Sequence, residues 1–257
     1  MNERITRLVL PRRTVLAGGA AIAGALIMRP ARAQVAEGGE GGAGGEGGAA
    51  REAGATVSLL TMLGLVEGHV RSGSALYAAG VSDMALVHKQ HPSKEIYGDL
   101  APMLEAVGAP GFAPELDAAA AAVMGGKDAA TVAAAEAAVL AAIGKAREAA
   151  KATPGEVAES VQALVRTAAD EYVVGIVDGQ VAQLAEYQDA WGFMRVARAQ
   201  TEALAAVAPE VAAKMAEALA PTDALFPDIV PKDRIAADPK ELQGAAARIE
   251  LARLQLK

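Results

Sequence analysis

Residues 164–193 read LVRTAADEYVVGIVDGQVAQLAEYQDAWGF, which has the pattern of two helices joined by a turn. Two helix-compatible runs flank Asp178-Gly179, a dipeptide that allows a tight reversal of the chain. We therefore predict a helix, a turn and a second, antiparallel helix. This hairpin would bring acidic side chains of the two helices to similar positions along the helix axes.

The remainder of the chain carries the same helical pattern. Alanine dominates the apolar residues, only 3% of residues are aromatic, and alternating β-branched runs are missing. Alanine is the best helix former, so the composition predicts an all-α fold. The segments 153–156 (TPGE) and 238–241 (DPKE) each place a capping oxygen, a proline and a glutamate as helix starts require. We predict a bundle of about eight helices, near 56–79, 83–90, 92–107, 113–124, 128–151, 154–175, 181–207 and 209–220, with 239–256 also helical.

The first 33 residues resemble a twin-arginine export signal. Arg12-Arg13 lead into the apolar run TVLAGGAAIAGALIM, and the small-residue cleavage motif Ala31-Arg32-Ala33 follows. Residues 34–55 repeat Gly-Gly-Glu and should form a flexible, acidic linker. The expected organisation is a signal at 1–33, a linker at 34–55 and a helical bundle domain at 56–257. We expect a periplasmic protein, exported by the twin-arginine route.

Charge and cysteine content exclude several classes of partner and site. The whole chain has a formal net charge of −7, and residues 1–33 contribute +5, so the remainder carries −12. Nucleic acid is therefore not an expected partner, whereas cations are attracted. The chain has no cysteine, which excludes disulfides, thiolate metal sites and iron–sulfur clusters. A metal ion would have to be held by histidine, carboxylate or other oxygen ligands.

All three histidines lie within 23 positions of one another, which suggests a metal site. His69 shares the apolar face of the first predicted helix, where a buried, hydrogen-bonded histidine is the alternative. His88 and His91 belong to HKQHPSKE, residues 88–95, together with Glu95. Pro92 should move His91 out of helical conformation and make it the cap of the next helix. The alternative for this segment is a polar turn without a ligand.

A second candidate cluster comes from the hairpin itself. Glu171 precedes the Asp-Gly turn, and Glu186 and Asp189 follow it. Carboxylates brought together from two antiparallel helices could hold a divalent cation. The alternative is that each of them lies on a solvated helix face.

The hairpin also carries a family resemblance. Its pattern is acid-Tyr, five residues, Asp-Gly-x-Val, four residues, Glu-Tyr-x-acid, three residues, Phe. This resembles the helical periplasmic region that precedes the membrane part of bacterial high-affinity iron permeases. The matching positions are Glu171, Tyr172, Asp178, Gly179, Val181, Glu186, Tyr187, Asp189 and Phe193. Iron permeases bind iron in membrane helices, and we find no run of about twenty apolar residues after the signal. The resemblance therefore implies a detached periplasmic part and not the channel.

A looser similarity links the chain to the imelysin-like periplasmic proteins of iron uptake. Like them, it is an exported helical bundle with histidines and acids near its start. Their GxHxxE motif is not reproduced, because position 72 is serine and not glutamate. A direct transfer of their metal site does not follow.

We therefore predict a periplasmic metal-binding accessory protein for the uptake or buffering of iron or another divalent cation, with copper, zinc and manganese as alternatives. A membrane permease or another inner-membrane complex would be its partner. The chain lacks nucleophile-elbow, phosphate-loop, dinucleotide and zinc-protease motifs, so we do not expect an enzyme. The alternative function is a helical scaffold without metal, docked on a membrane complex through the proline-rich segment 221–239, with Leu225, Phe226 and Ile229 as anchors.

Overall fold

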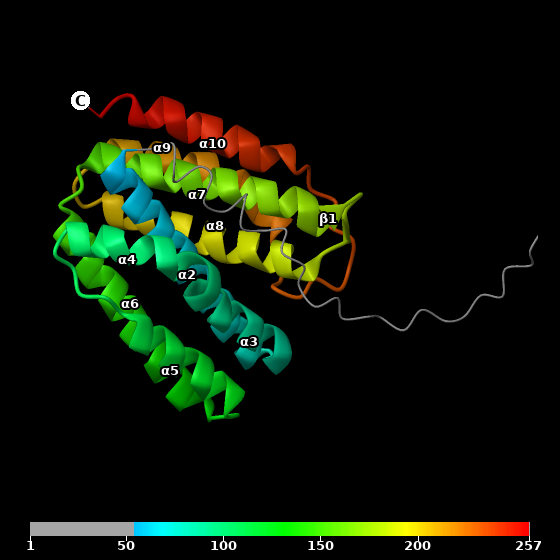
Figure 1. Ribbon diagram of the computed structural model, residues 1–257. Helices are drawn as coiled ribbons and strands as arrows, with labels where there is room; N and C mark the ends of the chain where they lie inside the picture. The colour runs from blue at the N-terminus through cyan, green and yellow to red at the C-terminus, as the bar shows by residue number, and fades with distance from the viewer. Residues whose placement is uncertain (1–53, 257) are drawn as a thin grey trace, which may run out of the picture. The chain divides into compact units, whose positions relative to one another are not determined.

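The computed structural model describes residues 54–256 and confirms the all-α prediction (Figure 1). The predicted signal at 1–33 and nearly all of the predicted linker lie outside the described residues. The described helices are α2 (Ala55–Ala78), α3 (Ser82–His91), α4 (Tyr97–Ala106), α5 (Ala113–Met124), α6 (Ala129–Ala150), α7 (Pro154–Gly175), α8 (Leu184–Leu204), α9 (Pro209–Leu219) and α10 (Lys240–Arg253). A π-helical turn η1 (Pro92–Ile96), a 3₁₀ turn η2 (Ala220–Leu225) and two short strands, β1 (Ile176–Val177) and β2 (Gln180–Val181), complete them.

Helix α2 is the central element of the bundle. It is buried on nearly all sides and packs against α8, α3, α6 and α7. Figure 1 shows α7, α8, α9 and α10 running side by side, and α5 and α6 forming a second pair beside α2 and α3. Because α2 contacts both groups, its side chains reach residues that are distant in sequence.

The predicted hairpin is present, with one addition. Helix α7 begins with the capping box of Thr153 and Glu156 and ends at the ribbon of β1 and β2, in which Val177 pairs with Gln180. Asp178 and Gly179 both have positive φ, as a two-residue hairpin turn of this type requires. The second helix therefore begins at residue 184 and not at 181. Strand β2 takes up Gln180 and Val181, and two further residues connect it to α8.

The crossing of α2 and α8 is unusually close. A Cβ atom added at Gly192 would collide with the backbone oxygen of Gly68 and the hydroxyl of Ser72, and one added at Gly68 would lie 2.5 Å from Phe193 Cδ1. Ser72 Oγ donates a hydrogen bond of 2.8 Å to the backbone oxygen of Gln188. Glycine on each helix thus lets the two backbones approach until a side chain of one can bind the backbone of the other.

The prediction that Pro92 moves His91 out of helical conformation and makes it the cap of the next helix is wrong. His91 has φ −52° and ψ −49°, so the chain stays helical through Pro92 and widens into the π-helical turn η1 before α4. A proline ring clashes with the carbonyl one turn before it in a regular α-helix. The wider turn follows the proline and closes with a hydrogen bond from Tyr97 N–H to the Pro92 oxygen, so the two helices join without a capped break.

The proline-rich segment after α9 packs on the bundle. It begins as the 3₁₀ turn η2 and continues without regular structure to residue 239. Tyr187 donates a hydrogen bond of 2.6 Å to the backbone oxygen of Asp228, and Phe226 packs against the rings of Tyr172 and Tyr187. Leu225, Phe226 and Ile229 are all buried within this chain. They are therefore not available as docking anchors, which corrects the scaffold alternative in that detail.

One described helix, α6, is long and apolar enough to cross a membrane by length and composition alone. The sequence-based expectation that no such segment follows the signal is corrected accordingly. The high hydropathy of α6 comes mainly from alanine, and its larger apolar residues, such as Val139 and Ile143, are buried in the bundle core.

The close crossing makes a prediction about stability. Replacing Gly192 with alanine should lower the free energy of unfolding by about 1–3 kcal/mol, because the new methyl group overlaps the backbone of α2. Gly144→Ala on α6 is the matched control, since a Cβ atom there meets no atom within 4 Å and alanine favours the helix. Urea unfolding of both variants measures the difference. Equal stabilities for the two variants would contradict a tight crossing.

Candidate metal centre

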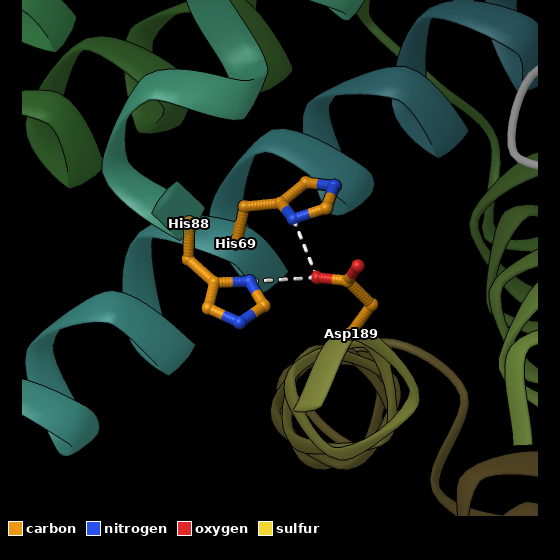
Figure 2. A group of neighbouring side chains, drawn as sticks. All are labelled: His69, His88 and Asp189. Atoms are coloured by element: carbon orange, nitrogen blue, oxygen red, sulfur yellow. Dashed lines mark ion pairs between the residues drawn. The ribbon is translucent and has the colours of Figure 1, made fainter. Parts of the chain in front are cut away.

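Three potential ligands from three helices meet inside the bundle (Figure 2). His69 lies on α2, His88 on α3 and Asp189 on α8. Their exposed fractions are 0%, 1% and 2%. Asp189 Oδ1 lies 2.7 Å from His69 Nδ1 and 2.9 Å from His88 Nδ1. One carboxylate oxygen thus faces two imidazole nitrogens in a site closed to solvent.

The helix crossing described above explains this meeting. His69 follows Gly68, and Asp189 lies less than one turn before Gly192, so both side chains flank the closest approach of α2 and α8. Phe193 packs its ring edge-on to His69, with 5.2 Å between ring centres, which limits rotation of the imidazole. The ligand positions are therefore fixed by packing before any ion binds.

Gln188 determines where His88 carries a proton. Its Nε2 donates to the backbone oxygen of Ile229 at 3.3 Å, which turns its Oε1 toward His88 Nε2 at 2.9 Å. Because an amide oxygen only accepts hydrogen bonds, His88 Nε2 must be protonated. In a neutral ring, His88 Nδ1 then presents its lone pair to Asp189.

Both contacts with Asp189 are short, and a neutral His88 places its Nδ1 lone pair against a lone pair of the carboxylate oxygen. Two lone pairs at such a distance repel each other. The arrangement is stable only if the imidazole gains a second proton or if a cation lies between nitrogen and oxygen. The site can therefore hold positive charge in either of these two forms.

The Asp189 carboxylate keeps its negative charge inside the protein. Burial by itself would raise its pKa, but the charges of His69 and His88 and their contacts with the carboxylate outweigh burial and hold the pKa of Asp189 below its usual value. An ionised carboxylate beside two imidazoles is a donor set suited to first-row divalent metals.

The spacing of the three groups fits a metal ion. Their ligand atoms all lie within 4.8 Å of one another. Bonds of about 2.0–2.1 Å in tetrahedral geometry place neighbouring ligand atoms about 3.3 Å apart. The present oxygen–nitrogen contacts are a few tenths of an ångström shorter, so small rotations of the side chains would seat an ion.

The remaining predicted ligands lie outside this group. The ring of His91 is 4.5 Å from that of His69 between centres, but its Nε2 pairs with Glu95 Oε2 at 2.6 Å. Glu171 is buried near the end of α7, and Glu186 is partly exposed in the first turn of α8. The structure thus joins Asp189 to two histidines and not to the acids of the hairpin.

Sequence reasoning missed the role of Gln188 and the buried position of Asp189. A signal was present, because Asp189 lies at i−4 from Phe193 and i−7 from Val196, both apolar and buried. An acid at this position of an apolar face indicates a buried charge that needs a partner. The partners themselves come from α2 and α3, more than 100 positions earlier, where no local pattern identifies them.

Comparison with known protein families gives one match. Residues 147–255 match the model described as the iron permease-associated 4-helix bundle domain. The match takes in α7 to α10 and the hairpin, and it confirms the resemblance to an iron permease-associated helical domain. It includes Asp189, whereas His69 and His88 precede it. The similarity to imelysin-like proteins stays a prediction. No curated protein and no solved structure matches the chain.

The charge arrangement makes a prediction about acid stability. Because the pKa of Asp189 is lowered by folding, its contribution is present above the unfolded-state pKa of about 3.9 and is lost as pH falls below that value. Asp189→Asn should reduce the free energy of unfolding by about 3 kcal/mol at pH 7, since it leaves buried imidazoles without their carboxylate. Urea unfolding between pH 2.5 and 8 should show this difference shrinking below pH 4.

Asp170→Asn is the control for that series. Asp170 lies exposed on α7, so its replacement should leave the profile unchanged. A constant difference between Asp189→Asn and the unmodified protein across the whole pH range would contradict the charged pairing.

Proposed function

We propose that this protein binds a first-row divalent metal ion, iron foremost, through His69, His88 and Asp189. The observation that carries the proposal is the meeting of two imidazoles and one carboxylate in a buried site, at nitrogen–oxygen contacts of 2.7 and 2.9 Å. Further ligands would come from solvent or from a bound anion.

The surroundings suit a ligand site. Gln188 Oε1 accepts a hydrogen bond from the protonated Nε2 of His88 and leaves Nδ1 for the ion, which is how outer hydrogen bonds usually orient metal-bound histidine. The ionised Asp189 supplies negative charge that offsets part of the charge of a divalent cation. Binding would displace the second proton of the imidazoles, so metal uptake and proton release are coupled.

The family match supports the biological setting of this binding. A domain described as iron permease-associated suggests a link to iron transport at a membrane. In our proposal the chain acts in the periplasm as an accessory that buffers iron or delivers it to a permease. The role is one of binding and not of catalysis.

Metal titration tests the proposal. The purified chain should bind one Fe²⁺ per molecule in anaerobic calorimetry, with Zn²⁺, Cu²⁺ and Mn²⁺ as comparisons. His69→Ala, His88→Ala and Asp189→Asn should each weaken binding by about 100-fold or more, because each removes a ligand. Gln188→Leu should weaken it by roughly 10-fold, because it removes an orienting hydrogen bond.

Two variants serve as controls for that titration. His91→Ala and Glu186→Gln change predicted ligands that lie outside the central group, so both should retain the affinity of the unmodified chain. The proposal fails if none of the four metals binds stoichiometrically below about 10 µM. It also fails if His91→Ala abolishes binding while His88→Ala does not.

Proton coupling predicts a pH dependence. Protons compete with a metal ion for the imidazole nitrogens, so affinity should fall as pH decreases. The expected slope is about one decade of Kd per pH unit for each proton displaced. Calorimetry in buffers of different ionisation enthalpy at pH 6 and pH 8 counts the released protons. Binding without proton release at pH 6 would contradict this site chemistry.

A further inference from the structure

A second concave site lies away from the metal centre. It is a cavity of about 660 Å³, bounded by parts of α2, α6, α8 and the first turn of α7. A volume of this size is typical of small-molecule sites in proteins. Glu67, which lines it, is two positions before His69 on α2, a rotation of about 200° around the helix. The cavity and the metal centre therefore occupy different faces of α2.

Arg147 lines this cavity and has two buried donors without a hydrogen-bond partner in the protein. Its Nη1 binds Glu67 Oε2 at 2.6 Å, whereas its Nε and Nη2 are buried and have no hydrogen-bond partner in the protein. Nε and Nη2 form one edge of the guanidinium group, the edge that binds a carboxylate in bidentate fashion. Unsatisfied buried donors are costly, so this edge indicates a missing acceptor.

Gln200 adds a third donor. Its side chain is buried, with 8% of the residue exposed, and its Nε2 has no hydrogen-bond partner in the protein. Its Oε1 lies 3.5 Å from Ser160 Oγ, which leaves Nε2 as the amide atom still to be satisfied. Gln200 and Arg147 line the same cavity from different helices.

Charge and surface of the cavity define the ligand class. Arg71, Arg147 and Lys151 line it together with Glu67 and Glu148, which leaves one net positive charge. Glu67 is already bound by both arginines. The remaining wall is apolar and includes Leu60, Val157, Leu204 and Val207. One unbalanced cation beside an apolar wall favours an anion that carries a hydrocarbon body.

We propose that this cavity binds a small organic carboxylate. Its carboxylate accepts two hydrogen bonds from Arg147 Nε and Nη2 and one from Gln200 Nε2, and its hydrocarbon part packs against the apolar wall. The site does not depend on the metal centre, since no residue is shared between the two.

Calorimetric titration with octanoate tests the proposal on the intact chain. Octanoate should bind with a stoichiometry of one. 1-Octanol, which has the hydrocarbon body without the charge, and inorganic phosphate, which has the charge without the body, should each bind at least 10-fold more weakly. Gln200→Leu keeps the size of the side chain and removes one donor, so it should weaken octanoate binding by about 10-fold. Arg147→Met should weaken it further.

The matched control is Arg166→Met, which removes an exposed arginine of α7 outside the cavity and should leave octanoate binding unchanged. Arg147→Met also removes one ion-pair partner of Glu67, so circular dichroism must show that this variant is folded. If Arg147→Met does not fold, the result for Gln200→Leu decides the test. The proposal is overturned if octanoate does not bind, if 1-octanol or phosphate binds as well as octanoate, or if Gln200→Leu binds it unchanged.

Discussion

The backbone contact between α2 and α8 is the constraint on which the rest of the structure depends. Gly68 and Gly192 remove the side chains that would hold the two helices apart, and Ser72 bonds the opposing backbone. A bundle with ordinary helix spacing of 8–10 Å would leave the imidazole of α2 and the carboxylate of α8 separated by other side chains. Here the close approach creates a small polar chamber inside an otherwise apolar core.

Two electrostatic effects oppose each other in that chamber. A buried carboxylate is unfavourable unless opposite charge and hydrogen bonds compensate for the lost hydration, and two imidazoles provide this for Asp189. Gln188 links the chamber to the irregular segment after α9, because its amide contacts both His88 and Ile229. The α7–α10 part of the chain, which matches the iron permease-associated domain, thus supplies the acid and the orienting amide, and the preceding helices supply the imidazoles.

Much of the fold could be predicted from local patterns, and the site could not. Capping at Thr153 and the positive φ of Gly80, Gly108 and Gly126 set helix ends, which depend on a few neighbouring residues. The conformation of His91 before Pro92 differs from the prediction because the chain passes from α3 to α4 through a π-helical turn and not through a capped break. The grouping of His69, His88 and Asp189 depends on how α2 crosses α8, and only tertiary packing determines that geometry.

The enclosure of His69, His88 and Asp189 has a kinetic consequence for the metal binding that we propose. With so little of these side chains accessible, an ion cannot enter or leave along the resting surface. Exchange must wait for a brief local opening, and the least regular neighbour is the proline-rich segment after α9, which Gln188 and Tyr187 hold by hydrogen bonds to Ile229 and Asp228. The rate at which this segment detaches would then set how long a bound cation stays in the site, independently of the equilibrium affinity for the cation. A partner protein that bound this segment and displaced it would release the cation without competing for His69, His88 or Asp189.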